Sequence, residues 1–226
     1  MDATTVDVIR RILISALPIL IAITFHEVSH GFVAYKLGDP TAKMLGRLTL
    51  NPLAHIDIFG TVLLPLLLVI ATNGQFVFGY AKPVPINPMN FKKPRQGMAL
   101  SAAAGPLTNM VLALLSVLIL KFIIVPLAEV SPATVTDTVL IPLGMIFRAS
   151  VIMNVVLAAF NMIPIPPLDG GRVLAGLLPS KQAISFSKIE PFGFIIVIVL
   201  IYTGIAGKII MPIISFFLSI FQIYLY

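Results

Sequence analysis

Two histidines and a glutamate lie close together near the N-terminus, in a stretch of sequence that is otherwise suited to lipid. The stretch is ILIAITFHEVSHGFVAYKLG, and it contains His26, Glu27 and His30. Residues four apart lie on one face of a helix, so both imidazoles can bind one Zn²⁺ with Glu27 beside it as general base. Ionisable groups inside a membrane are costly and usually functional. The spacing therefore predicts a zinc-dependent hydrolase site with one Zn²⁺ per chain, which activates a water molecule.

A catalytic zinc site of this kind needs a third protein ligand, and the chain has no cysteine to supply it. The remaining candidates are His55, Asp39, Asp57, Glu129, Asp137, Asp169 and Glu190. Asp169 is favoured because it lies in NMIPIPPLDGG, where prolines stop an apolar helix and two glycines permit a sharp turn. Such a turn can direct a carboxylate inward at membrane depth. His55 is an accessory metal ligand in one interpretation and a local hydrogen-bonding group in the other.

The composition places these residues in a membrane protein. Hydrophobic residues make up 58% of the 226 residues and charged residues only 11%, which is too few to cover a soluble domain. Four apolar runs are long enough to cross a bilayer as helices. They are Val8–Leu37, Met98–Val125, Val139–Asn161 and Phe192–Tyr226, the last divided into two helices near Gly204–Lys208. We therefore expect an all-α polytopic membrane protein with about five transmembrane helices, in a single domain over residues 1–226. The dispersed net charge of +6 does not indicate nucleic-acid binding.

Two further segments are expected to differ from transmembrane helices. Phe59–Ala71 is apolar, but it is short and contains Pro65, which favours a re-entrant or interfacial segment. The segment Gln75–Pro94 alternates aromatic, small and proline residues, and the alternation around Phe76–Tyr80 predicts a short β-hairpin-like element at an edge. Such an edge can pair with an unwound substrate by strand addition.

The two metal-binding motifs, HEVSH and NMIPIPPLDGG, resemble those of the site-2 proteases, a family of intramembrane zinc metalloproteases. The resemblance extends over GRLTLNPLAHID, GYAKPVPINP and AGPLTN, which begin at residues 46, 79 and 104. The chain is similar to the minimal subgroup that has no PDZ or CBS domain. The resemblance implies that the protein cleaves the transmembrane segments of other membrane proteins within the lipid bilayer.

The resemblance also implies a role for each residue of the two motifs. It implies that His26, His30 and Asp169 bind zinc and that Glu27 is the catalytic base. By the same resemblance, Asn109 and Asn161 are expected near the site, where they contact the substrate backbone or the oxyanion. In the alternative interpretation, a buried amide caps or bridges helices.

Two other functions would use a similar set of residues. A membrane transporter that binds zinc also places histidine and aspartate within the membrane, but it has no need of a glutamate beside the metal. A non-catalytic scaffold of the same fold is expected to have lost Glu27 or one of the ligands, whereas this sequence keeps all four residues.

The distribution of positive charge predicts the orientation in the membrane. If the site residues converge, the ends of the apolar runs that carry them lie on one side of the bilayer. That side has ten of the lysines and arginines: Lys36, Lys43, Arg47, Lys82, Lys92, Lys93, Arg95, Arg172, Lys181 and Lys188. The opposite side has four, which are Arg10, Arg11, Lys121 and Lys208. Because positive charge is enriched on the cytoplasmic side, we expect a cell (inner) membrane protein whose active site and C-terminus face the cytoplasm and whose N-terminus is outside.

Overall fold

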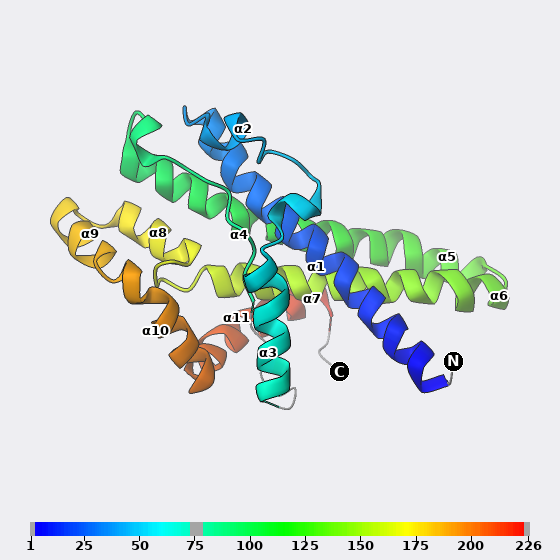
Figure 1. Cartoon of the computed structure of the whole chain (residues 1–226). Coiled ribbons are helices and arrows are strands. Elements are labelled where there is room, and N and C mark those ends of the chain that lie inside the picture. The colour runs from blue at the N-terminus through cyan, green and yellow to red at the C-terminus, as the bar shows by residue number, and fades with distance from the viewer. Residues whose placement is uncertain (1–2, 73–78, 224–226) are drawn as a thin grey trace.

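The structure is a computed structural model, and it describes residues 3–72 and 79–223. Within these residues the regular secondary structure is entirely helical (Figure 1). The α-helices are α1 (Ala3–Lys36), α2 (Thr41–Met44), α3 (Leu64–Ala71), α4 (Pro94–Ile119), α5 (Val125–Val130), α6 (Ala133–Val135), α7 (Ile141–Asn161), α8 (Asp169–Leu177), α9 (Ser180–Ser187), α10 (Glu190–Tyr202) and α11 (Ile205–Phe221). Short 3-10 helices cover Pro52–His55 and Pro88–Asn90, and π-helical turns cover Ile58–Leu63, Leu120–Ile124 and Thr136–Leu140.

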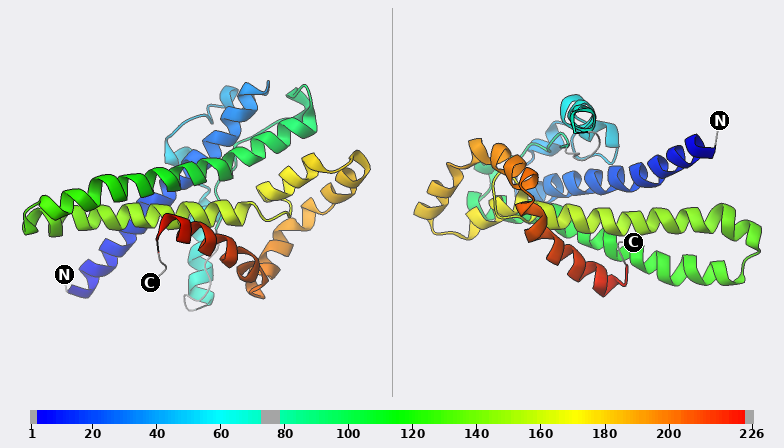
Figure 2. Two further views of the ribbon diagram at one scale, coloured as in Figure 1. Left: turned by 180° about the vertical axis from the view of Figure 1, so that it is seen from behind. Right: turned by 90° about the horizontal axis from the view of Figure 1, so that it is seen from below.

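Three long helices form the centre of the molecule. The π-helical turns join α4 to α5 and α6 to α7, so the helices continue over Pro94–Val130 and Ala133–Asn161. These two helices lie side by side along their length, and α1 crosses them (Figures 1 and 2). Small residues of α4 are buried at the crossing, among them Ser101, Ala104 and Gly105. Small side chains let helix backbones approach closely, which is how helices commonly associate in lipid.

The expected membrane-protein character is confirmed by three helices that are long and apolar enough to cross a membrane, or four if one bent pair is counted as a span. The three are Ile14–Lys36, Pro94–Val130 and Ala133–Asn161. The bent pair consists of α9 and α10, which meet at an angle of 66°. The C-terminal apolar run is divided as predicted, because Gly204 has a positive φ of 73° and separates α10 from α11. α11 then packs back against α7 through Ile210 and Ile214.

Helix α3, between α1 and α4 in the chain, is largely exposed along its length. None of the residues of α3 is buried, and this helix points away from the central bundle, across the direction of α4 and α7 (Figures 1 and 2). The hairpin-like element predicted around Phe76–Tyr80 lies largely outside the described residues, and no strand is assigned to residues 79–87. These residues are instead held by hydrogen bonds from the amides of Tyr80 and Lys82 to the carbonyls of Gly60 (3.0 Å) and His55 (2.9 Å).

Candidate metal centre

His26, His30 and Asp169 meet at one buried point, although Asp169 is far from the histidines in sequence. The Nε2 atoms of His26 and His30 lie 3.1 and 3.3 Å from Oδ2 of Asp169. One nitrogen from each histidine and one carboxylate oxygen lie within 4.8 Å of one another, so a single ion could bind to all three. This is the only such group of His, Cys, Asp and Glu side chains within residues 3–72 and 79–223.

The position of Asp169 depends on the tight turn that precedes it. Asp169 is the first residue of α8, directly after the segment in which prolines end α7. A Cβ on Gly170 would collide with the carbonyl of Met162, and one on Gly171 would collide with the backbone of Pro166. The backbone can therefore fold back on itself only because both residues are glycine. This close return carries the Asp169 carboxylate from the end of α7 to the two histidines on α1.

Each histidine is held by a hydrogen bond on the side opposite Asp169. His26 Nδ1 lies 2.5 Å from Oδ1 of Asn109, and His30 Nδ1 lies 2.7 Å from the carbonyl oxygen of Ser101. Both partners are acceptors, so Nδ1 carries the proton in each ring and the lone pair of Nε2 faces Asp169. Metal-binding histidines typically have this arrangement, in which the second nitrogen donates to an oxygen that fixes the ring.

Two observations show that the site fits a metal cation. Oδ2 of Asp169 is buried and has no hydrogen-bond donor among the described residues, although two nitrogen lone pairs face it. Buried polar atoms are normally satisfied, so three facing acceptors call for a cation between them. The backbone of Gly105 also lies directly against the two imidazole rings. A side chain there would not fit, because a Cβ on Gly105 would lie 2.5 Å from His30 Nε2 and 2.6 Å from His26 Cε1. The donor set of two imidazoles and one carboxylate is typical of catalytic zinc sites.

The metal centre opens into a cavity of about 460 Å³. Glu27 lines this cavity next to His26 and His30, and its Oε2 accepts a 2.8 Å hydrogen bond from the amide of Val84. Much of the remaining lining is apolar. The segment before α4, together with α10, contributes Tyr80, Ala81, Pro83, Ile86, Phe194 and Val197, and further lining residues come from α4, α7 and α8. A carboxylate therefore faces the same space as the metal group, together with a surface that suits an apolar chain.

The two asparagines expected near the site occupy different positions. Asn161 lines the cavity, and its Nδ2 donates one hydrogen bond to the carbonyl of Leu157 (3.0 Å). Asn109 is fully buried behind His26, and its Nδ2 donates to the carbonyl of Ala22 (3.2 Å) and to Oδ1 of Asn154 (2.8 Å). Both amide hydrogens of Asn109 are thus used inside the protein. Asn161 thus faces the cavity, whereas the amide of Asn109 lies behind His26 and bridges helices.

The structure does not bring His55 to the metal centre. Its side chain is 2% exposed, and its Nε2 lies 2.9 Å from the carbonyl oxygen of Thr49. It is also absent from the described lining of the cavity. The accessory ligand role is therefore not supported, and the alternative of a local hydrogen-bonding group describes its position.

Among the other candidates for the third ligand, the acidic residues with hydrogen bonds or ion pairs have them elsewhere. Asp39 bonds to Thr41, Asn87 and Asn90. Asp57 accepts from the amide of Gly60, and Glu190 forms an ion pair of 3.7 Å with Arg172.

Four residues at the site were missed by reasoning from the sequence. They are Ser101, Gly105, Asn154 and Arg172, of which only Arg172 lines the cavity. Gly105 lies within the recognised AGPLTN stretch and Arg172 directly follows NMIPIPPLDGG, which is a usable signal. Ser101 contacts His30 through its backbone carbonyl, so its residue type could not have predicted this role. Asn154 could have been found as a polar residue in an apolar run, because buried amides in a membrane are rarely without a function.

Comparisons with known proteins agree with this site. The model of the family "Peptidase family M50" matches residues 14–204. "Putative zinc metalloprotease YwhC" of Bacillus subtilis (strain 168) is 38% identical over 197 residues, which cover 87% of this chain and 84% of that protein. "Putative zinc metalloprotease Rip2" of Mycolicibacterium smegmatis is 29% identical over 184 residues, which cover 81% of this chain and 64% of that protein. No solved structure matches the chain at a significant level.

The family match covers most of the chain, including both motifs that carry the metal group. The names of the family and of the relatives indicate a zinc metalloprotease. The chain belongs to peptidase family M50, the site-2 protease family.

Proposed function

We propose that this protein is an intramembrane zinc endopeptidase that cleaves transmembrane segments of other membrane proteins. The observation that carries the proposal is the position of Glu27, which shares one apolar-lined cavity with His26, His30 and Asp169. A metal site made only for transport or structure has no need of a carboxylate facing the same space. The cavity lies within a helical membrane protein, so a substrate that reaches it from the lipid is itself a membrane-spanning chain.

The chemistry follows from the side chains of the cavity. His26, His30 and Asp169 would hold Zn²⁺, which lowers the pKa of bound water and polarises the substrate carbonyl. Glu27 would accept the proton of the attacking water and pass it to the nitrogen of the leaving amine as the peptide C–N bond breaks. Asn161 is the cavity-lining amide that can donate to the oxyanion, because one of its two amide hydrogens is not used by Leu157.

The direct test is cleavage of a single-span membrane protein by the purified full chain in proteoliposomes. Glu27→Gln should retain zinc and lose at least about a hundredfold in kcat, since general acid–base catalysis contributes about 10²–10⁴-fold. Glu129→Gln is the matched control, because Glu129 is exposed on α5. Cleavage that survives Glu27→Gln would overturn the mechanism. Zinc uptake into the vesicles without any cleavage by the unmodified protein would support a transporter instead.

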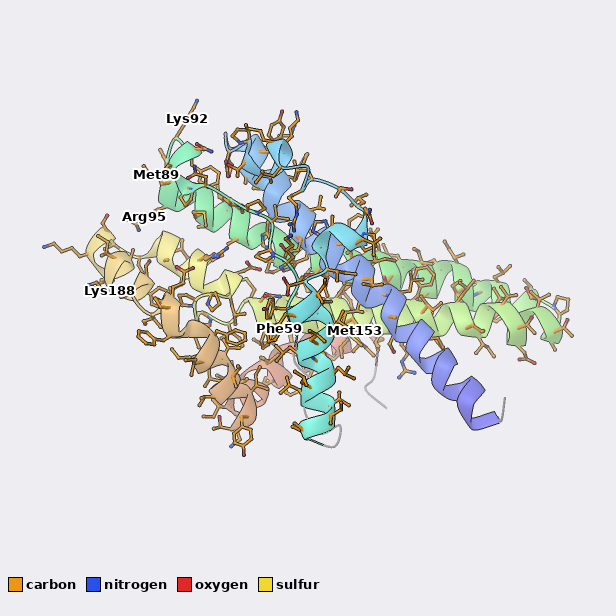
Figure 3. The ribbon with its side chains drawn as sticks, viewed as in Figure 1. Phe59, Met89, Lys92, Arg95, Met153 and Lys188 are labelled. Carbon is orange, nitrogen blue, oxygen red and sulfur yellow. The ribbon has the colours of Figure 1, made fainter. Side chains whose placement is uncertain are left out.

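We propose further that the bent pair of α9 and α10 acts as a fourth span, that α11 is the fifth apolar segment expected from the sequence, and that the active site faces the cytoplasm. Both α10 and α11 are shorter than the three long helices, and Gly204 separates them. Ile58–Ala71 would then be a re-entrant or interfacial segment, which its exposed surface and its direction across α4 and α7 support. The side chains of Lys92, Arg95 and Lys188 lie together at the end of the molecule opposite the α5–α6 turn (Figure 3). Positive charge at that end favours the cytoplasmic side.

The absence of cysteine in the sequence makes this orientation easy to test. Lys92→Cys and Ala133→Cys each introduce a single exposed thiol, one at the start of α4 and one at the start of α6. In intact cells, a membrane-impermeant maleimide should label Ala133→Cys, and it should label Lys92→Cys only after permeabilisation. The reverse pattern would overturn the proposed sidedness, and equal labelling of both would show that Pro94–Val130 does not span the membrane.

We also propose that the cavity holds the substrate by backbone pairing along residues 79–86. A helix hides its carbonyls in its own hydrogen bonds, so the scissile bond must unwind before it can be attacked. The amides of Tyr80 and Lys82 bond toward the loop at residues 55–60. In an extended chain, successive residues face opposite ways, so the amide of Ala81 points away from that loop. Ala81 also lines the cavity, where an unwound substrate could pair with it.

Substitutions at Ala81 test this pairing separately from catalysis. Ala81→Pro removes the amide hydrogen, and kcat/KM should fall about fivefold, the value of one net hydrogen bond of about 1 kcal/mol. Ala81→Ser keeps the amide and serves as the control, and zinc content should be unchanged in both variants. Equal cleavage rates for the two variants would contradict the pairing.

A further inference from the structure

A series of buried polar side chains leads from the metal centre through α4 to α7. Asn109 and Asn154 are both 0% exposed, and Asn109 Nδ2 donates to Oδ1 of Asn154 at 2.8 Å. Asn154 Nδ2 in turn donates to the carbonyl oxygen of Ser150 at 2.9 Å. The series begins at His26, whose Nδ1 contacts Oδ1 of Asn109 at 2.5 Å. The three side chains therefore connect α1, α4 and α7 by hydrogen bonds that are shielded from solvent.

The direction of these hydrogen bonds is fixed by two backbone carbonyls, because Ala22 accepts from Asn109 Nδ2 at 3.2 Å and Ser150 accepts from Asn154 Nδ2. The carbonyl of Ser150 can only accept, so Asn154 must turn its Nδ2 toward Ser150 and its Oδ1 toward Asn109. Asn109 then presents Nδ2 to Asn154 and Oδ1 to His26. In the reverse orientation, Nδ2 of Asn109 would face His26 and require the lone pair of Nδ1. The proton of the imidazole would then sit on Nε2, which could no longer bind a metal ion.

We infer that Asn154, through a shorter hydrogen bond than that of the Ala22 carbonyl, is a positioning residue that helps hold Asn109 in the orientation that leaves His26 Nε2 available to the metal. The inference rests on the proposed function insofar as His26 is taken to bind the metal. His30 needs no such help, because its Nδ1 faces the backbone carbonyl of Ser101, which cannot turn into a donor. Asn154 thus acts on one ligand of the site and not on the other.

The first experiment measures zinc affinity by chelator competition on the purified full chain in detergent. Asn154→Leu keeps the branched shape of the side chain, although leucine is larger, and removes the acceptor for Asn109. Zinc affinity should fall about tenfold, the lower end of the range for partners behind a metal ligand. Ser150→Ala is the matched control on the same helix, because of the contacts of Asn154 Nδ2 it removes only the longer one, to Ser150 Oγ at 3.2 Å, and keeps the Ser150 carbonyl that orients Asn154. It should leave the affinity unchanged. Absence of zinc binding by the unmodified protein would defeat the proposed function, whereas equal affinities for Asn154→Leu and Ser150→Ala would overturn this inference.

A double-mutant cycle separates positioning from a general loss of packing. Asn109→Leu should lower zinc affinity by about 10–100-fold. If Asn154 acts through Asn109, adding Asn154→Leu to that variant should cause no further loss. Additive losses would show that Asn154 acts independently and would overturn the inference. If Asn154→Leu does not fold, Asn154→Ala takes its place in the cycle. The absorption spectrum of the Co²⁺-substituted protein gives a second readout, and it should change in Asn154→Leu but not in Ser150→Ala.

Discussion

The central bundle of α1, α4 and α7 buries polar side chains, whereas the outer helix α3 leaves its apolar side chains exposed. Inside the bundle, the fully buried side chains include the polar Ser101, Asn109 and Asn154. In α3, by contrast, Leu66 and Leu67 are 53% and 56% exposed. An apolar side chain that faces lipid costs the protein little free energy, whereas a polar side chain in the membrane needs a hydrogen-bond partner within the protein. We therefore expect substitutions of hydrogen-bonded polar residues in the bundle to affect the protein more than substitutions of apolar residues on the outer helices α3, α10 and α11.

The glycines of the bundle and of the outer helices differ in the same way in how much space surrounds them. A Cβ on Gly105 in α4 would press on both metal-binding imidazoles. A Cβ on Gly207 in α11 would meet no atom within 4 Å. The same substitution to alanine should therefore have opposite consequences in the two regions, and the following predictions test this contrast.

The largest effect is expected from Asp169→Ala, which removes the only carboxylate in the metal group. Two imidazoles alone bind zinc weakly, so zinc should be lost on dialysis and cleavage should fall to background. Metal content measured by mass spectrometry checks the prediction. Asp137→Ala is the control, because Asp137 is exposed near the α6–α7 junction and should keep its zinc. Full zinc content in Asp169→Ala would show that Asp169 is not a ligand.

A smaller loss is expected from Gly105→Ala, which adds one methyl group against the rings of His26 and His30. The rings must shift by several tenths of an ångström, so zinc affinity should fall about 10–100-fold, as it does when other supports of metal ligands are removed. Chelator competition measures this change. In Gly144→Ala the new methyl would meet its nearest neighbour at an ordinary 3.6 Å, so this variant should bind zinc like the unmodified protein. A Gly105→Ala variant with unchanged affinity would show that the site has more room than the structure indicates.

The sequence predicted much of the bundle and the metal group because both depend on local patterns. Long apolar runs specify spanning helices, and the spacing of His26 and His30 specifies a common face. The turn that carries Asp169 was also predictable, since its prolines and glycines each impose a local conformation.

What the sequence did not predict depends on contacts between distant segments. The bond between Glu27 and the amide of Val84 involves a backbone group, which no residue type reveals. The sequence left open whether Asn109 faces the substrate or bridges helices, because its partner Asn154 lies on another helix. An amide close to a metal motif can face the cavity or the helix behind it, and only the packing of three helices decides between them.

A loss of stability without loss of zinc is expected from Asp39→Asn, where the bundle meets the rim of the cavity. Burial alone would raise the pKa of Asp39, but hydrogen bonds from Thr41, Asn90 and the amide of Asn87 outweigh it and hold the pKa below its usual value. Replacing the carboxylate should lower the free energy of unfolding at pH 7 by about 1–3 kcal/mol.

The same carboxylate makes stability depend on pH. Because the pKa is lower in the folded state, the stabilisation from Asp39 is present above the usual pKa of about 4 and is lost as the pH falls through the folded value. Thermal unfolding in detergent between pH 7 and pH 3 should therefore show a smaller acid-induced loss in Asp39→Asn than in the unmodified protein. Parallel curves for the two proteins would contradict this account of Asp39.

The smallest effect is expected at the two glycines of the outer helix, and it isolates the backbone from packing. A Cβ on either Gly204 or Gly207 meets no atom within 4 Å, but only Gly204 has a positive φ, at 73°. Gly207→Ala should stabilise α11 by about 0.5 kcal/mol through helix propensity, whereas Gly204→Ala should cost about 1 kcal/mol because a left-handed conformation is strained for alanine. Thermal unfolding distinguishes a rise from a fall in melting temperature, and zinc affinity should stay the same in both variants. A loss of zinc from Gly207→Ala would mean that the outer elements support the metal centre directly, and the contrast between the two regions would then fail.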